Sequence, residues 1–216
     1  MPKTEWKDRV LPLIRSYDER APLVLNASLA FNLLYALFKL IAGIWFRSFW
    51  MIGLGGYYGM LAIMRFLLIR PLRKEDPAAA RRAYRRTARL LLGLTIVMTG
   101  IIGQTFVSRE TYDYPGPLIY AFAAFAFGKI ITAVISLIRK RNHENRVLDA
   151  ARCVSFAQAL MSVLALQVAL INRFGANSPG FARSMNGAAG TVICLLVILI
   201  AVIMLVKSSS DKQRAR

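Results

Sequence analysis

Two lysines lie inside long apolar stretches of this chain, where a charged side chain is costly. Lys39 belongs to the apolar run 23–46 and Lys129 to the run 118–138. A Lys within a membrane-spanning helix costs about 3 kcal/mol on insertion scales, so such residues normally face a helix bundle or a wet cavity. Two inward ammonium groups would attract an anion. The alternative is that the side chains snorkel outward to the membrane surface, and the sequence leaves both interpretations open.

Polar residues at helical spacing accompany these lysines. Three polar stripes of this kind occur: Ser28, Asn32, Tyr35 and Lys39; Lys129, Thr132 and Ser136; and Ser155, Gln158 and Ser162. Residues three and four apart share one face of a helix. The three stripes therefore predict a hydrated interior, unless the hydroxyl and amide groups only join neighbouring helices.

The candidate anion site combines charge and hydrogen bonds. Lys39 and Lys129 would supply the charge, and the hydrogen-bonding residues would be Asn32, Tyr35, Tyr57 and Gln158. A third intramembrane cation, Arg65, lies five residues from one end of its apolar run. We expect Arg65 to be a snorkelling anchor at the membrane surface.

The chain lacks the groups that catalysis and metal binding require. None of its eleven Asp and Glu residues lies in an apolar run, and the single histidine, His143, lies in a charged cluster between Arg141 and Glu144. General acid–base and nucleophilic catalysis need such groups close together. Cys153 and Cys194 are expected to be reduced thiols, too few for a structural zinc site. We therefore predict no enzymatic activity, no metal and no cofactor.

Six apolar runs make up most of the chain: 23–46, 49–69, 90–107, 118–138, 154–171 and 188–206. Each is long enough, or nearly so, to cross a hydrocarbon core of about 30 Å as a helix. A backbone in lipid must satisfy its own hydrogen bonds, and the alternating pattern of a transmembrane barrel is absent. The predicted fold is an all-α integral membrane protein, with a six-helix domain over 23–206 between tails at 1–22 and 207–216.

The net charge of +18 is distributed unevenly along the chain. The tails and alternate loops at 1–22, 70–89, 139–152 and from 207 onward carry 22 basic residues, against 4 in the opposite loops. The positive-inside rule then places both termini in the cytoplasm and suits an inner or plasma membrane, which we expect to be bacterial. This pattern explains the charge without a nucleic-acid partner.

The loop after the second apolar run is strongly basic. Pro77 is expected to open a short helix, and its arginines share a side: Arg81, Arg82, Arg85, Arg86 and Arg89. Each basic residue near an anionic leaflet contributes about 1 kcal/mol, so Arg81, Arg82, Arg85 and Arg86 are a candidate site for anionic lipid headgroups. The alternative is that these residues only determine the topology.

Two short patterns bear on assembly. The segment 35–44 resembles 125–134 in character at nearly every position, and three helices per copy would give a 3+3 inverted repeat, as in many secondary transporters. Gly55 and Gly59 form a Gly-x-x-x-Gly motif, which permits close approach either within the bundle or across a homodimer interface.

The run from Asn32 through Lys39 and Gly43 to Ser48 resembles the first helix and following turn of the cation diffusion facilitator family. The resemblance implies that family's six-helix membrane domain with cytoplasmic termini. The family binds its divalent metal through Asp and His residues four apart on two helices. The approximate equivalents here are Tyr57 and Leu61, and Val154 and Gln158, which are not usual ligands for zinc, iron or manganese. The family's cytoplasmic metal-binding domain is also absent.

The sequence therefore predicts a transporter-like membrane protein that handles a small anionic solute or a lipid headgroup rather than a divalent metal. The alternative is a non-transporting assembly or sensory partner that retains a transporter-like fold. The first predicts anion flux, and the second predicts a stable complex without flux.

Overall fold

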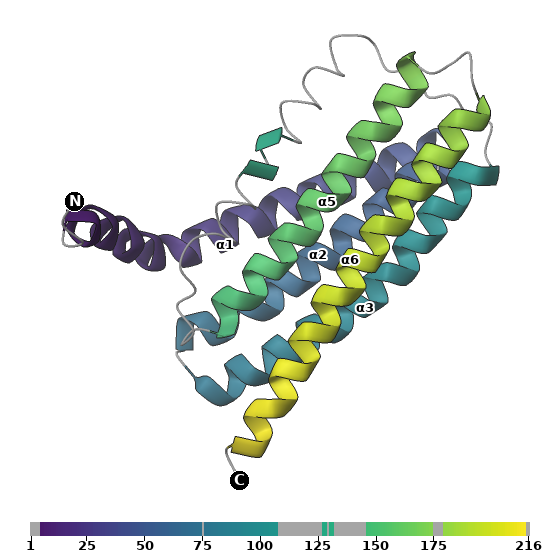
Figure 1. Ribbon diagram of the computed structural model, residues 1–216. Helices are drawn as coiled ribbons and strands as arrows, with labels where there is room; N and C mark the ends of the chain where they lie inside the picture. Colours follow the sequence, from purple (N-terminus) through teal and green to yellow (C-terminus); the bar gives the residue numbers. More distant parts are fainter. Residues whose placement is uncertain are drawn as a thin grey trace.

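The computed structural model describes residues 5–74, 76–107, 127–128, 130–131, 146–174 and 179–214. Over these ranges the chain forms long helices: α1 (Glu5–Trp45), α2 (Phe49–Lys74), α3 (Pro77–Val107), α5 (Arg146–Phe174) and α6 (Pro179–Arg214). They lie side by side as an elongated bundle (Figure 1). All five are long and apolar enough to cross a membrane.

The bundle is apolar on the outside and holds polar groups within. Large exposed apolar side chains occur on each helix, for example Leu34, Ile63, Ile96, Leu170 and Leu195. Asn32, Lys39, Arg65 and Gln158 are buried. This is the reverse of a water-soluble bundle, and it is the arrangement that a lipid environment favours because lipid solvates apolar side chains.

The helices extend beyond the apolar runs from which they were predicted. α1 already begins at Glu5, α5 begins at Arg146 rather than 154, and α6 begins at Pro179 rather than 188. Hydropathy reports only the part of a helix that lies in the hydrocarbon. Backbone hydrogen bonding continues wherever the residues permit a helix.

A tight turn joins α1 to α2. The amide of Ser48 donates to Gly43 O (2.8 Å), that of Arg47 donates to Ile44 O (3.2 Å), and Arg47 has a φ of 50°. This is a Schellman motif with an arginine in the left-handed position that glycine usually occupies. The Ser48 Oγ accepts the amide of Met51 and caps α2.

Glycines set the close contact between α1 and α2. A Cβ on Gly43 would lie 2.8 Å from the backbone nitrogen of Ile52, and one on Gly55 would lie 2.6 Å from the Leu40 side chain. A Cβ on Gly59 would meet nothing within 4 Å. Of the predicted Gly-x-x-x-Gly motif, Gly55 therefore serves packing within the bundle.

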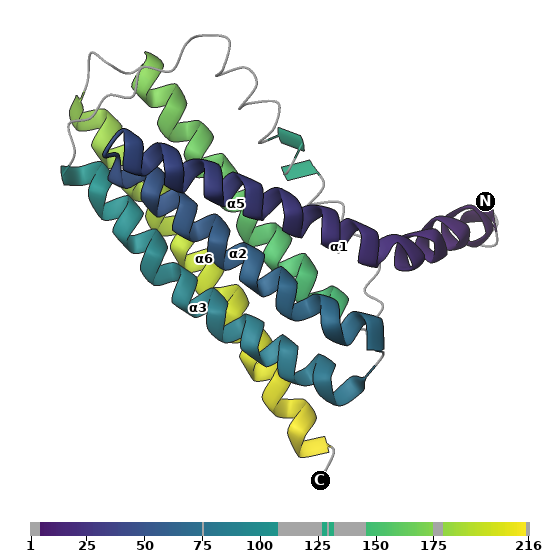
Figure 2. The same cartoon turned by 180° about the vertical axis from the view of Figure 1, so that it is seen from behind.

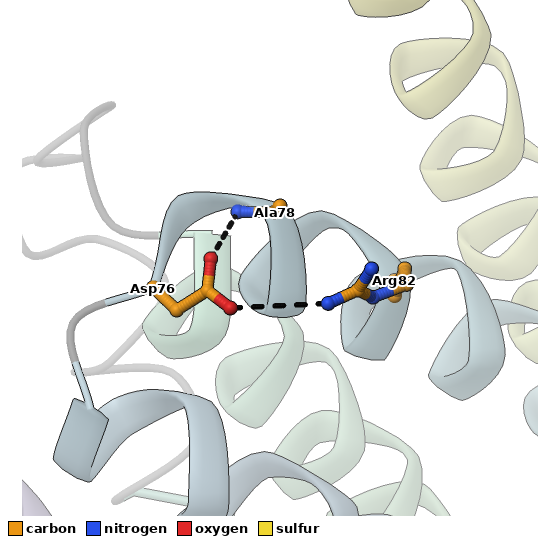
Figure 3. A network of polar contacts seen from close by, with 3 residues as sticks. All are labelled: Asp76, Ala78 and Arg82. Carbon is orange, nitrogen blue, oxygen red and sulfur yellow. Dashed lines mark hydrogen bonds and ion pairs between the residues drawn. The ribbon is translucent and has the colours of Figure 1, made fainter.

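The start of α3 confirms the prediction for Pro77. Asp76 caps the helix: its Oδ1 accepts the amide of Ala78 (2.8 Å), and its Oδ2 lies 3.8 Å from Arg82 Nη2 (Figure 3). An aspartate N-cap followed by proline at the first helical position is a favoured helix start. The helix is not short, however, since it continues without a break to Val107 and is long and apolar enough to cross a membrane.

α3 and α5 run in the same direction along the bundle, and α6 runs in the opposite one (Figures 1 and 2). The last residue of α3 and the first residue of α5 therefore lie at opposite ends of the bundle. The sixth predicted span, 118–138, falls in this interval and lies outside the described residues, apart from 127–128 and 130–131, which are helical. The segment 125–134, which resembles 35–44, lies in the same interval, and only 127–128 and 130–131 of it are described.

α3 and α6 pack along one another through an apolar contact surface. Both helices contribute buried apolar residues to the core, among them Leu94, Met98 and Ile102 of α3 and Ile193, Val197 and Ala201 of α6. Gly190 lets the two helices approach closely, because a Cβ there would lie 2.6 Å from Ile102 Cγ1. We call this contact between α3 and α6 the apolar seam. It lies on the side of the bundle opposite α1 (Figure 2).

Candidate functional site

The polar stripe of α1 faces the bundle. Asn32 and Lys39 are buried and Tyr35 is half-buried, whereas the neighbouring Leu34 and Phe38 are exposed. The spacing of the stripe predicts this orientation, because a helix presents residues three and four apart on one side. The outward positions of α1 are filled by leucine, isoleucine and phenylalanine, which suit contact with lipid.

A hydrogen-bonded network of four side chains connects α1, α2 and α5. Arg65 Nη2 donates to Gln158 Oε1 (2.8 Å) and to Ser155 Oγ (3.3 Å). Gln158 Nε2 donates to Asn32 Oδ1 (2.8 Å). Asn32 is 0% exposed, Gln158 1% and Arg65 4%, so these three side chains are buried within the bundle, whereas Ser155 is half-buried.

The prediction for Arg65 is wrong. The side chain turns into the bundle, where α5 presents Ser155 and Gln158 as acceptors, instead of extending to the membrane surface. Two hydrogen bonds from a charged donor favour this direction over an extended rotamer in lipid. A sequence signal for this direction existed: Tyr58, Ala62 and Arg65, spaced four and three apart, lie on the buried side of α2.

Gln158 also holds its neighbours in place. Its backbone carbonyl accepts the hydroxyl of Ser162 (3.0 Å), one turn further along α5. Tyr57, which is fully buried, donates its hydroxyl to Ala157 O (2.7 Å) and so joins α2 to α5 next to the network. Of the predicted hydrogen-bonding residues, Asn32 and Gln158 thus contact each other directly, and Tyr57 contacts the adjacent turn.

Lys39 and Tyr35 form a second group further along α1. Lys39 Nζ lies 5.5 Å from the centre of the Tyr35 ring, a cation–π geometry, and Tyr35 packs edge-on against Tyr58 of α2 at 4.5 Å. Lys39 follows Asn32 by seven residues, or roughly 10 Å along the helix. Lys39 and Asn32, the α1 member of the network, thus occupy successive levels on the inner side of α1. Lys129, the other predicted lysine, lies outside the described residues.

Tyr57, Leu61, Val154 and Gln158, the positions that the resemblance would align with metal ligands, carry no usual metal donor. Leu61 and Val154 are fully buried in the apolar core, and Tyr57 and Gln158 are engaged in the hydrogen bonds described above. In the part of the chain that the structure describes, no three His, Cys, Asp or Glu residues lie close enough to hold a metal ion. Hydroxyl and amide groups without a carboxylate or imidazole suit neither zinc nor manganese.

The charged side chains at one end of the bundle are arranged differently from those of the buried network. Asp149, the one acidic residue among the spans of the five described helices, pairs with Lys207 of α6 at 2.6 Å. Arg146 lies over the ring of Tyr84 of α3 at 5.8 Å. Four of the five arginines along the first turns of α3 are exposed, and Arg85 is half-buried. These basic residues face outward, away from the buried network.

Comparison with known proteins adds no relative to this description. No family model, no curated protein and no solved structure matches the chain.

Proposed function

We propose that this protein is a transporter-like membrane protein that handles a small anionic solute or an anionic lipid headgroup, and that it is neither an enzyme nor a carrier of divalent metals. The observation that supports this proposal is the buried network of Asn32, Arg65, Ser155 and Gln158. Its four side chains carry one positive charge in total. Ionisable residues within membrane spans are costly and are usually retained for ligand or ion handling.

The proposed architecture is a six-helix bundle of the cation diffusion facilitator type, with the sixth span at 118–138 and a 3+3 inverted repeat. The parallel course of α3 and α5 supports a further crossing between them. The proposed location is a bacterial inner membrane with both termini in the cytoplasm, which the positions of the basic residues support. A homodimer is part of the same proposal.

In this architecture the substrate path follows the inner side of α1. Lys39 and Lys129 would attract the anion, and the hydrogen-bonding residues along the path would be Asn32, Tyr35, Tyr57 and Gln158. The outward arginines of α3 would contact anionic headgroups through Arg81, Arg82, Arg85 and Arg86. The inward and outward basic groups would thus have separate roles, one in the path and one at the lipid surface.

Flux measurements in proteoliposomes test the function. The native chain and the double variant Lys39→Met with Lys129→Met would be compared for uptake of a panel of small anions and divalent metals. The proposal expects anion flux in the native chain, loss of that flux in the double variant and no metal flux. An absence of all flux from correctly folded native protein would contradict transport. It would favour a non-transporting partner, which gentle pull-down from native membranes would then identify.

A further inference from the structure

We infer that the Asn32–Gln158–Arg65 network is a binding site for a small, planar, monovalent oxyanion of the carboxylate or nitrate type. The inference deepens the proposed function and rests on it, since it names the ligand class and assigns the central charge to Arg65 rather than to a lysine. It depends on the direction of the hydrogen bonds and on one buried donor.

The hydrogen bonds of the network have a fixed direction. An arginine guanidinium has five N–H donors and no acceptor, so Gln158 must turn its Oε1 toward Arg65. Gln158 then presents Nε2 to Asn32, and Asn32 must answer with Oδ1. Asn32 Nδ2 is therefore the donor at the far end of this series of hydrogen bonds. The amide orientations therefore follow from Arg65 and not from a free choice at each residue.

Asn32 Nδ2 is a buried donor without an acceptor. Within the described part of the chain no hydrogen-bond partner lies in reach of this atom, although Asn32 is 0% exposed. A buried polar group left unsatisfied carries a free-energy penalty, so it is uncommon in folded proteins. The network begins with a positive charge and ends with an unsatisfied donor. The ligand that completes it has to be an acceptor with a negative charge.

The charge of the site and its burial restrict the charge, shape and size of the ligand. One guanidinium compensates one negative charge, and a divalent anion would leave the second charge buried without compensation. The two amide donors, Gln158 Nε2 and Asn32 Nδ2, suit a ligand with two coplanar acceptor oxygen atoms. Because these side chains are buried, the ligand has only a few atoms. Formate and nitrate have these properties, whereas sulfate and chloride lack one or more of them.

Binding takes place between α1 and α5. The Asn32–Gln158 hydrogen bond spans these two helices, and α1 otherwise packs mainly on α2. When this bond opens, an anion oxygen replaces Asn32 Oδ1 as the acceptor for Gln158 Nε2. A second oxygen accepts from Asn32 Nδ2. The anion thus takes over the donor of Gln158 and satisfies Asn32 Nδ2, which the closed form leaves without a partner, while Asn32 Oδ1 gives up its hydrogen bond to Gln158.

Equilibrium binding to the purified full-length chain tests this inference separately from transport. Sodium formate and sodium nitrate would be titrated calorimetrically, with sodium sulfate and sodium chloride as comparison salts. We expect saturable binding of formate and nitrate and at least roughly tenfold weaker binding of sulfate and chloride. Absence of saturable formate and nitrate binding, or equal binding of sulfate, would overturn the assignment.

Variants locate the site. Asn32→Asp keeps an acceptor for Gln158 but replaces the terminal donor with an acidic oxygen, so binding should be lost. Arg65→Gln should abolish binding as well. The matched control is Arg70→Gln, an exposed arginine on the same helix, which should bind like the native chain. Unchanged affinity in correctly folded Asn32→Asp protein contradicts the inference, and it does so even if Arg65→Gln fails to fold.

The two proposals fail in different ways. Anion binding that depends on Asn32 and Arg65, without flux, would support the site and contradict transport. Anion flux that persists in Asn32→Asp and Arg65→Gln would support transport and contradict this site.

Discussion

Two helix contacts in this bundle are built on opposite principles. Where α5 meets α1 and α2, the contact is made by hydrogen bonds through Asn32, Tyr57, Arg65 and Gln158, and we call it the polar seam. Where α3 meets α6, buried apolar side chains predominate and the helices approach closely at Gly190, opposite Ile102. Lipid is as apolar as leucine, so an apolar seam gains stability only from dense packing. A polar seam fixes the direction of its hydrogen bonds, but it keeps a charge in a place where charge is costly.

The difference predicts how each seam responds to change. The stability of the apolar seam should depend on side-chain volume and little on individual hydrogen bonds. The polar seam should respond to the loss of a single acceptor, because a charged donor remains buried. We therefore expect function to depend on the polar seam and the apolar seam to hold the bundle together.

The largest effect is expected for Gln158→Leu. The substitution keeps a similar volume but removes the Gln158 Oε1 acceptor of Arg65 and the donor to Asn32. Loss of a hydrogen bond to a buried charge should lower the free energy of unfolding by about 3 kcal/mol. Thermal or denaturant unfolding in detergent would measure this. Gln167→Leu, which removes a bond from the same helix to Met185 O, is the control and should change stability much less. Equal losses in the two variants would remove the distinction between the seams.

Overpacking tests the apolar seam. In Gly190→Ala the new methyl group would meet Ile102 Cγ1 at 2.6 Å and Cδ1 at 2.8 Å, so the Ile102 side chain or one of the two helices must shift. We expect a loss of about 2 kcal/mol, in the usual range for overpacked cores.

Two further variants make this test specific. Gly100→Ala adds the same methyl group to open space and should be nearly neutral. Combining Gly190→Ala with Ile102→Val, which shortens the opposing side chain, should restore part of the lost stability. A neutral Gly190→Ala would show that the apolar seam is packed more loosely than the structure indicates.

A smaller effect is expected for Tyr57→Phe. The variant removes the hydroxyl that bridges α2 to Ala157 O of α5 and leaves the ring in place. The expected loss is about 1 kcal/mol, the typical net contribution of one hydrogen bond. Thr191→Val on α6 removes a hydroxyl that bonds only to Gly187 O within its own helix, and it should have less effect. Similar unfolding midpoints for the two variants would argue against a stabilising role for the bridge.

The smallest effect lies outside both seams, in the turn between α1 and α2. Arg47 has a φ of 50°, which glycine adopts without strain. Arg47→Gly should therefore raise stability by up to about 1 kcal/mol. Arg47→Val should lower it, because a β-branched residue fits the left-handed region poorly. The unfolding midpoint should be highest for Arg47→Gly, intermediate for the native chain and lowest for Arg47→Val. Any other order would contradict the assigned turn.

Several elements could be predicted from local sequence alone. The apolar runs at 49–69, 90–107, 154–171 and 188–206 lie within helices of the structure, and the run at 23–46 does so up to Trp45. Pro77 does open a helix, because an aspartate before a proline is a local signal that needs no tertiary contact. The inward face of α1 also followed from spacing. Asn32 and Lys39 recur at helical intervals among residues that prefer lipid.

The candidate site was only partly predictable. Asn32 and Gln158 were identified from polar stripes, but their direct contact depends on how α1 and α5 are rotated against each other. The length of each helix was underestimated, because hydropathy cannot detect a helix that continues into water.

The sequence by itself determined that the described helices are long and apolar enough to cross a membrane and which face of α1 turns inward, since both follow from the pattern of apolar and polar side chains. The tertiary structure alone decided the position of Arg65. An arginine near a helix end can extend to the membrane surface or turn inward, and the choice depends on acceptors contributed by another helix, here Ser155 and Gln158, ninety or more residues away. Likewise, only the packed structure distinguished Gly55, which contacts α1, from Gly59, which faces open space. Such choices depend on the rotation of each helix about its axis. That rotation is set by the contacts between helices and cannot be read from the sequence of one helix alone.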